Sequence, residues 1–148
     1  MEKIQVRIRK LDERAKMPVY SSEYAAGMDL YAFVDGSVMI APGETVMIHT
    51  KLAAEIPAGY AGLIYARSGM AVKKGLAPAN KVGVVDADYR GEIMVALYNH
   101  SPEDRFVEDG DRIAQMVITP VPAVELIEAE ELGGSVRGEG GFGSTGDR

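Results

Sequence analysis

The chain has 148 residues, a length that suits a single folded domain with a core of its own. Apolar residues make up 47% and charged residues 26%, proportions that are ordinary for a globular protein. The absence of cysteine excludes disulfides, thiolate metal sites and a cysteine nucleophile. The net charge of −6, with no Lys/Arg run longer than two, argues against a nucleic-acid partner. A few converging arginines could still bind a small anion.

The first ten residues lack the apolar stretch of a signal peptide, and no segment reaches the length of a membrane span. We therefore expect a soluble protein that has no membrane partner. A cytoplasmic location is the default expectation, with the nucleus as an alternative for a eukaryotic source. The identity of the partner has to come from the motifs.

Apolar residues alternate with a period of two, which predicts strands rather than helices. At the N-terminus Ile4, Val6 and Ile8 alternate with polar neighbours. Further segments rich in β-branched and aromatic residues predict strands at 38–40, 45–50, 60–65, 92–98 and 113–118. Turn-forming sequences separate them: Asp35-Gly36, Pro42-Gly43, Pro57-Ala58-Gly59, Ser101-Pro102 and Asp109-Gly110. Many short strands at regular spacing predict an all-β sandwich, jelly roll or barrel.

Two segments depart from this pattern. Residues 68–74 are the one predicted short helix, with Ser68 as its N-cap and Gly75 as its end. Residues 133–146 form a tail in which seven of fourteen residues are glycine, so we expect the tail to be mobile without a ligand. We divide the chain into a β-barrel domain over residues 1–132 and a glycine-rich arm over residues 133–148.

The tail also carries groups that suit a nucleotide. Its glycines let backbone N–H groups approach phosphate oxygens closely. Arg137 offers a bidentate guanidinium, Ser144 and Thr145 offer hydroxyl donors, and Phe142 offers a ring that can stack on a base. The alternative is a disordered C-terminus that only adds solubility. The interleaved arginine, phenylalanine and Ser-Thr pair count against that alternative.

A second segment, Gly83–Gly91, brings two valines directly to an acid. This order predicts the end of a strand that delivers the Asp86 carboxylate into a pocket, where it could activate a water. The alternative is a surface β-turn in which Asp86 and Asp88 are turn formers. Taken alone, the segment favours the turn.

Three further segments carry weaker signals. Arg67 and Ser68 lie where a strand would meet a helix N-terminus, a junction whose N–H donors suit phosphate, or else they form a plain helix cap. Residues 110–116 predict a turn that opens a strand, and taken alone they favour a plain hairpin with a polar edge. Asp29 is a lone acid in an apolar run, so we expect it to be buried and paired.

Taken together and in this order, the five segments resemble the signature motifs of the trimeric dUTP diphosphatase family. The matching segments are Ala26–Leu30, Arg67–Ala71, Gly83–Gly91, Gly110–Gln115 and Arg137–Gly146. The resemblance implies a jelly-roll or distorted β-barrel (β-clip) subunit and a homotrimer with active sites at the subunit interfaces. It also implies Mg²⁺-dependent hydrolysis of dUTP to dUMP and pyrophosphate. This reaction limits uracil incorporation into DNA and supplies dUMP for thymidylate synthesis.

The resemblance further implies roles for single residues in the nucleoside half of the site. Asp86 matches the aspartate that deprotonates the water attacking the α-phosphorus. Tyr89 matches the tyrosine that packs under the deoxyribose and leaves no room for a 2′-hydroxyl. Asn80, with the nearby backbone of Gly83 and Val85, matches the group that binds the uracil edge.

In the phosphate half, the resemblance implies phosphate-chain ligands at Arg67, Ser68, Gly69 and Gln115. The last motif closes over the bound nucleotide, with Phe142 over uracil and with Arg137, Gly143, Ser144 and Thr145 at the γ-phosphate. The phosphates and waters hold most of the Mg²⁺ coordination shell. Asp29 is expected to order the site, through a metal-bound water or as a structural acid.

Two rival functions remain at this stage. A dCTP deaminase shares the implied fold but typically has serine in place of Gly69 and lacks the Asp86–Tyr89 run, so both features favour the diphosphatase. A catalytically silent nucleotide-binding protein on the same scaffold is the rival from another class. The two histidines, His49 and His100, lie at neither triad nor metal-ligand spacing, and we treat them as structural or surface residues.

Overall fold

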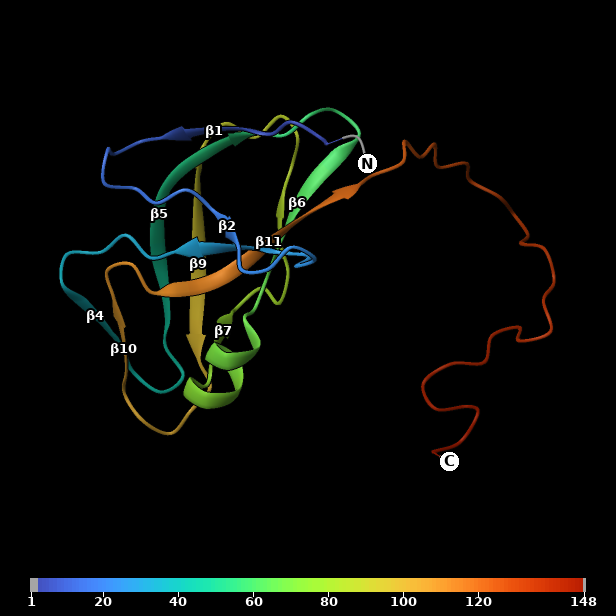
Figure 1. The fold of residues 1–148 in the computed structure, drawn as a ribbon. Helices are drawn as coiled ribbons and strands as arrows, with labels where there is room; N and C mark the ends of the chain where they lie inside the picture. The colour runs from blue at the N-terminus through green and yellow to red at the C-terminus, as the bar shows by residue number, and fades with distance from the viewer. Residues whose placement is uncertain (1–2, 148) are drawn as a thin grey trace.

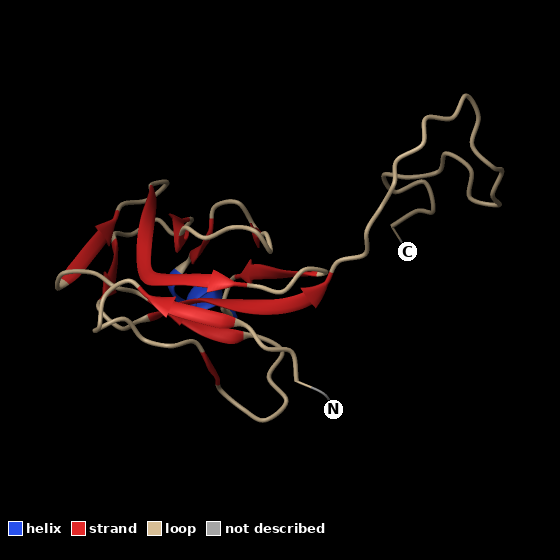
Figure 2. Cartoon of the chain, turned by 90° about the horizontal axis from the view of Figure 1, so that it is seen from above, coloured by secondary structure: helices blue, strands red, loops and turns tan. Residues whose placement is uncertain are grey.

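Antiparallel β-structure makes up nearly all the regular structure of the chain (Figures 1 and 2). The computed structural model describes residues 3–147. The strands are β1 (Arg7–Lys10), β2 (Val19–Tyr20), β3 (Met28–Tyr31), β4 (Ser37–Ile40), β5 (Thr45–Glu55), β6 (Tyr60–Tyr65), β7 (Leu76–Pro78), β8 (Gly83–Val85), β9 (Glu92–Asn99), β10 (Arg105–Glu108) and β11 (Arg112–Pro120). The prediction of an all-β fold with one short helix is therefore confirmed.

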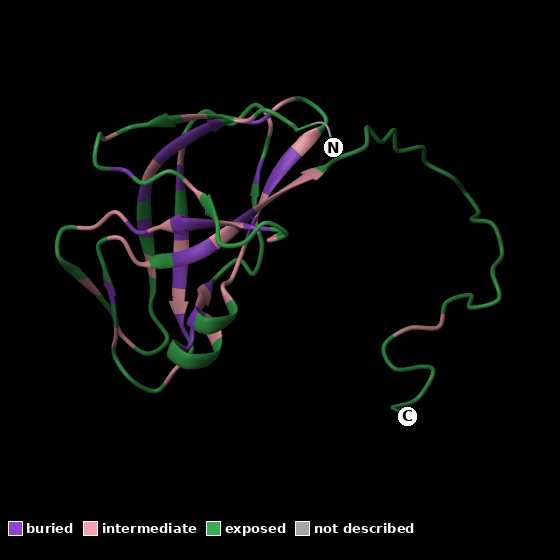
Figure 3. Cartoon of the chain, viewed as in Figure 1, coloured by how far each residue is buried: buried purple, intermediate pink, exposed green. Residues whose placement is uncertain are grey.

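The strands form three sheets around one core. A four-stranded sheet has the order β1-β5-β9-β7, a five-stranded sheet the order β2-β3-β11-β6-β8, and β10 pairs with β4 alone. Leu97 of the first sheet and Leu30 of the second are both completely buried in the same apolar cluster. In β9 every second side chain is buried, which is the alternation that the sequence predicts (Figure 3).

The predicted strands are present, and most of their ends lie within two residues of the predicted bounds, with larger shifts in the first and the fifth. The first strand begins at Arg7 rather than Ile4. The fifth continues to Glu55, past the predicted end at Thr50, because a bulge lets the chain pair again beyond Lys51. Lys51 has a φ of 56°, so the backbone bends there without leaving the sheet.

The helix η1 (Met70–Lys74) lies at the predicted place, and Ser68 and Gly69 before it are also helical, so the helical stretch covers the predicted residues 68–74. Gly69 occupies the N-cap position and no side chain caps the helix, so the assignment of Ser68 as N-cap is wrong. Gly75 ends the helix as predicted, in the left-handed region with a φ of 67°. Its N–H donates to the carbonyls of both Met70 and Ala71, which widens the turn into a π-helix. Within residues 3–147, every helix falls short of the length and apolar character that a membrane crossing needs.

Beyond β11 the chain leaves the sheets (Figures 1 and 2). Residues 121–147 contain no strand or helix, and nearly all of them are exposed (Figure 3). The exposed extension thus begins twelve residues before the glycine-rich arm predicted at 133.

The buried side chain of Asn99 joins three parts of the barrel. Its Nδ2 donates to the carbonyls of Ile40, at 2.8 Å, and Glu103, at 2.7 Å. Its Oδ1 accepts from the N–H and the hydroxyl of Ser101. The completely buried amide of Asn99 therefore provides hydrogen-bond partners for the last carbonyl of β4 and for polar groups of the loop after β9.

We expect Asn99→Leu to lower the free energy of unfolding by about 3 kcal/mol, because leucine fills the space but leaves the Ile40 and Glu103 carbonyls unpaired. Urea denaturation at fixed protein concentration measures this loss. Glu103→Ala is the matched control: it keeps the backbone carbonyl and should change stability by about 0.5 kcal/mol at most. An Asn99→Leu chain as stable as the control would contradict the assigned role.

Candidate active site

A cavity of about 240 Å³ lies beside the turn that follows β8. Strand β8 pairs with β6, with Val85 opposite Gly62 and Gly83 opposite Ile64. The cavity is lined by Met47, Ile64, Asn80, Gly83, Val84, Val85, Asp86, Tyr89, Glu92, Ile93 and Met94. It thus brings together all five residues that the sequence assigns to the nucleoside half of the site. We call it the nucleoside cavity.

Asp86 lies on the wall of this cavity, directly after the end of β8. Its carbonyl accepts the N–H of Tyr89 at 3.2 Å, so residues 86–89 form a β-turn. Both sequence interpretations therefore hold, since the turn is also what carries the carboxylate to the cavity. The Asp86 carboxylate is exposed, and no hydrogen bond or ion pair engages it within residues 3–147. Such a carboxylate is available to bind and deprotonate a water.

The ring of Tyr89 is held in one orientation. Its hydroxyl donates to the carbonyl of Glu92 at 2.8 Å. A Cβ added at Gly91 would collide with the Tyr89 hydroxyl and ring, so the ring packs directly against the glycine backbone. The sequence Tyr-Arg-Gly-Glu therefore fixes a half-exposed aromatic ring at the cavity wall.

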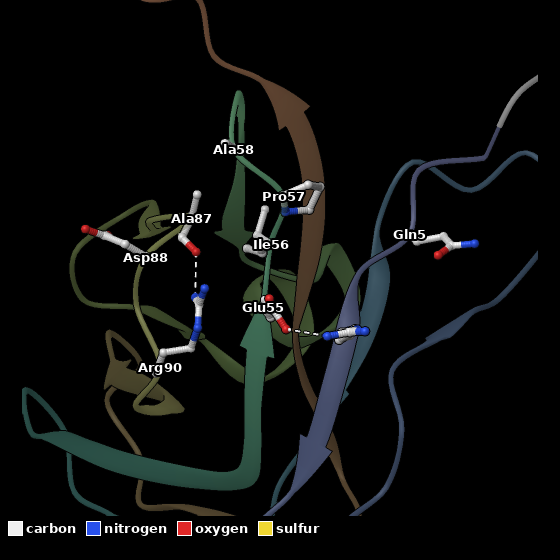
Figure 4. A pocket seen from close by; sticks show the side chains of 9 residues that line it. Gln5, Glu55, Ile56, Pro57, Ala58, Ala87, Asp88 and Arg90 are labelled. Carbon is white, nitrogen blue, oxygen red and sulfur yellow. Dashed lines mark hydrogen bonds and ion pairs between the residues drawn. The ribbon is translucent and has the colours of Figure 1, made fainter.

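Arg90 supports the same turn from its other side. Its guanidinium donates to the carbonyl of Ala87 at 2.6 Å and to that of Tyr89 at 3.2 Å. This side of the turn faces a different cavity, of about 400 Å³, in which Arg7 pairs with Glu55 (Figure 4). That larger cavity contains neither Asp86 nor Tyr89 in its wall, so the sequence-predicted chemistry lies in the smaller one.

A second group of site residues surrounds Asp29 in β3. Asp29 Oδ1 accepts from Arg67 Nε at 2.8 Å, and Asp29 Oδ2 lies 3.5 Å from a terminal nitrogen of Arg112. The prediction that Asp29 is buried and paired is confirmed, since its side chain is only 9% exposed. Arg112 is a residue that the sequence reasoning did not assign to the site. Its position inside the matching segment Gly110–Gln115 was the available signal.

The two arginines open onto a cavity of about 290 Å³, which we call the cationic cavity. It is lined by Arg67, Gly69, Met70, Lys73, Lys74, Asp111 and Arg112. Four of these side chains are cationic and only Asp111 is anionic. The region is therefore locally positive, although the net charge of the whole chain is −6. A Cβ at Gly69 would meet no atom within 4 Å, so the packing of this chain alone does not require glycine there.

Gln115 links two of the motifs. Its Nε2 donates to the carbonyl of Ala66 at 2.9 Å, next to Arg67. A Cβ at Gly27 would run into the Gln115 side chain, which explains the glycine that precedes Asp29 by two positions. Ser68 is exposed at the entrance to the helical turn. The four predicted phosphate ligands therefore lie together at this end of the sheet.

Asp86 and Arg67 lie toward opposite ends of β6. Because Val85 is opposite Gly62 in an antiparallel pair, Asp86 lies at the level of Ala61. Arg67 follows the other end of the strand, six residues further along. At about 3.3 Å per residue, Asp86 and Arg67 of one chain are about 20 Å apart along the strand direction.

The tail residues form a third group. Within the tail, Arg137 Nε donates to the carbonyl of Gly140 at 2.7 Å, and the Phe142 ring is fully exposed. Gly143, Ser144 and Thr145 belong to the same extension, which points away from the barrel (Figure 1). A single chain therefore does not bring the three predicted parts of the site together.

Comparison with known proteins agrees with these motifs. Residues 13–146 match the dUTPase family model. The chain is 47% identical over 146 residues to the deoxyuridine 5′-triphosphate nucleotidohydrolase of Syntrophotalea carbinolica, with 99% of each chain covered. A mutant dUTPase of Staphylococcus bacteriophage 80alpha with dUpNHpp superimposes with a TM-score of 0.87 at 30% identity, covering 96% of this chain and 98% of that one. A mutant dUTPase of S. aureus phage phi11, described with a structural Mg(II) ion, gives a TM-score of 0.77 at 29% identity and covers 86% and 97%. On the strength of the family match and the near-complete relative, the chain belongs to the dUTPase family.

Proposed function

We propose that the chain hydrolyses dUTP to dUMP and pyrophosphate, and so limits uracil in DNA while supplying dUMP for thymidylate synthesis. The observation that carries this proposal is the nucleoside cavity, where an unengaged carboxylate, Asp86, lies beside a fixed aromatic ring, Tyr89. The family membership and a relative named for this reaction support the same conclusion. The proposed location is the cytoplasm, or the nucleus as well if the source is eukaryotic.

The proposed chemical step is attack of water on the α-phosphorus. Asp86 accepts the proton of that water as the O–P bond forms, and pyrophosphate leaves. Attack at phosphorus needs in-line positioning and neutralisation of charge more than a covalent intermediate. Exposure of the Asp86 carboxylate to the cavity supports this role, because a carboxylate already engaged by an arginine is a weaker base.

The proposed selectivity uses three walls of the nucleoside cavity. The Tyr89 ring packs under the deoxyribose and leaves no space for a 2′-hydroxyl. Asn80 and the backbone of Gly83 and Val85 bind the uracil edge. Rejection of a 5-methyl group needs only a close wall, which backbone and small side chains can form.

The cationic cavity is the proposed site for the phosphate chain. Arg67, with its Nε bonded to Asp29, keeps its terminal nitrogens for phosphate oxygens. Gln115, Ser68 and Gly69 lie at the same end of the sheet and complete the phosphate ligands. Arg112 joins them as a further cation, oriented by the other oxygen of Asp29.

Mg²⁺ is the proposed cofactor, held mainly by the triphosphate and by waters. The residues fit this arrangement: among residues 3–147 no group of three acids or histidines could hold an ion by itself. Both oxygens of Asp29 are engaged by arginines, so any contact of Asp29 with the ion would run through a water. When bound, the ion would neutralise phosphate charge.

We further propose that the active enzyme is a homotrimer with sites shared between subunits. The backbone separation of about 20 Å between Asp86 and Arg67 along β6 supports this, since Asp86 of one subunit and Arg67 of its neighbour could approach one triphosphate more closely. A closed ring of identical subunits places the nucleoside cavity of one beside the cationic cavity of the next. The tail then closes over the nucleotide, with Phe142 on the base and Arg137, Gly143, Ser144 and Thr145 at the γ-phosphate.

The direct test is pyrophosphate release from dUTP, UTP, dTTP and dCTP, each with Mg²⁺ and with EDTA. We expect release from dUTP with Mg²⁺ that exceeds the other three nucleotides by at least about a hundredfold in kcat/KM. Ammonia release from dCTP, measured in parallel, would identify a deaminase instead. An inert protein would refute the proposal.

Asp86→Asn should lower kcat for dUTP by about a thousandfold or more, because the amide cannot accept the proton of the attacking water. Binding of dUTP should stay within about threefold of wild type, since the isosteric amide removes no contact to the nucleoside. Single-turnover kinetics and calorimetry measure the two quantities. Near-normal turnover would show that another group is the base.

Mixing two inactive variants tests the shared site. Asp86→Asn and Arg67→Gln chains, unfolded together and refolded, should recover about a quarter of wild-type activity, because each chain type fills each half of a site half the time. Each variant alone has a lesion in every site and should stay inactive. If Asp86 and Arg67 served the same site from one chain, mixing would restore nothing. Sedimentation should first show that both variants assemble.

Deletion of residues 137–148 should lower kcat/KM for dUTP by about a hundredfold or more, because the donors at the γ-phosphate are lost. The assembly should keep its mass by light scattering, since the barrel cores are untouched. Arg137→Lys in the full chain is the milder control, which retains the charge but not the bidentate fork. A deletion variant that dissociates into monomers would contradict the assigned role of the tail.

A further inference from the structure

Glu92 is a nearly buried acid that the proposed mechanism does not use. Its side chain is 14% exposed, and it lines the nucleoside cavity at the start of β9. One carboxylate oxygen lies 2.7 Å from Nδ1 of His49, and the other accepts the N–H of Lys51 at 2.9 Å. The ammonium of Lys51 lies 3.9 Å from the same oxygen. Both oxygens are therefore engaged, in contrast to those of Asp86.

These contacts hold an irregular part of the neighbouring strand. His49 pairs with Met94 and Ala53 pairs with Glu92, so three residues of β5 lie opposite Ile93 alone. Lys51, inside this bulge, has a φ of 56°, which is costly for a residue with a side chain. The Glu92 carboxylate accepts the backbone N–H of this strained residue and so fixes the bulge against β9.

The backbone of Glu92 holds the ring of Tyr89, which faces the deoxyribose under the proposed function. The carbonyl of Glu92 accepts the hydroxyl of Tyr89, while Gly91 leaves just enough space for that ring. The side chain of Glu92 is tied to β5 and its backbone is tied to Tyr89, so one residue connects the bulge to the ring. Movement of the Glu92 backbone would move the acceptor that sets the tilt of the ring.

We propose that Glu92 is a positioning residue for sugar selection, which sets the ring of Tyr89 by anchoring the start of β9 to the β5 bulge. This inference rests on the proposed function, because it assumes that the Tyr89 ring excludes the 2′-hydroxyl. His49 supports the anchor as the partner of the second carboxylate oxygen. The charged groups that face Glu92 are His49 and Lys51 on β5, and Asp86 lines the same cavity.

The test is the ratio of kcat/KM for dUTP to that for UTP. Glu92→Ala should lower this ratio by about tenfold, with a rise in KM for dUTP and a kcat that falls by less than about threefold. Glu92→Gln keeps an oxygen for the Lys51 N–H and should restore the ratio to within about threefold of wild type. Equal losses for dUTP and UTP would mean that Glu92 serves only stability, and would overturn the proposal.

A double-mutant cycle tests whether Glu92 acts through Tyr89. Tyr89→Phe removes the hydroxyl that bonds the Glu92 carbonyl and should also lower the ratio. The double variant should be no less selective than the worse single variant, because both changes release the same ring. Additive losses would show that Glu92 acts by another route.

Glu44→Ala is the matched control. The Glu44 carboxylate accepts the backbone N–H of Ala41 at 2.8 Å, the same kind of bond in a turn outside the wall of the nucleoside cavity. It should leave the dUTP/UTP ratio within about twofold of wild type, although it too removes a carboxylate that accepts a backbone N–H. A ratio lowered as far as in Glu92→Ala would show that selectivity only tracks stability.

Calorimetry with the imido analogues of dUTP and UTP separates this inference from the function itself. If wild type binds the two analogues equally, the proposed function fails. If wild type prefers the deoxy analogue and Glu92→Ala keeps the full preference, only the role of Glu92 fails.

Discussion

The register of β6 is the constraint on which the arrangement of the site depends. One side of β6 pairs with β8 and thereby fixes Asp86 near Ala61, while its far end leads into Arg67. Its other side pairs with β11, which brings Gln115 opposite Tyr65. A one-residue slip in either pairing would turn buried side chains to the surface, so packing of the core holds the register. The register in turn sets the distance between Asp86 and Arg67. This distance is one reason for the proposal that two subunits share each site.

Three acids near the site have different surroundings, which separate their roles. Asp29 is buried and bonded to two arginines, so its charge serves to orient these cations. Glu92 is nearly as buried and bonds two groups of β5. Asp86 alone is exposed to the cavity with its oxygens unengaged. Among these three acids, Asp86 alone has no partner that competes with a bound water, which suits it best to the proposed role of base.

The sequence predicts the long elements well because each carries several periods of alternation. Strand β6 has the predicted bounds, and Gly75 ends the helix as expected. Strands β2, β7 and β8 have two or three residues each, too few for any period to show, and they exist because neighbouring strands offer them partners. The role of Ser68 and the bulge at Lys51 depend on tertiary contacts that local propensity does not contain. The motifs identified Asp86, Tyr89 and Arg67, but only strand register gives their separation.

Division of the site between subunits also bears on how the reaction would turn over. Under the proposed function, intact dUTP binds both the nucleoside cavity and the cationic cavity, so its affinity gains from contacts that one molecule links together. Hydrolysis between the α- and β-phosphates cuts this link. The dUMP then retains the contacts around Tyr89 and Asn80, and the pyrophosphate retains those around Arg67 and the tail. Each product loses the advantage of the linked contacts, and the glycine-rich tail regains its conformational freedom when the pyrophosphate leaves. The proposed division of the site between subunits would therefore also favour release of both products.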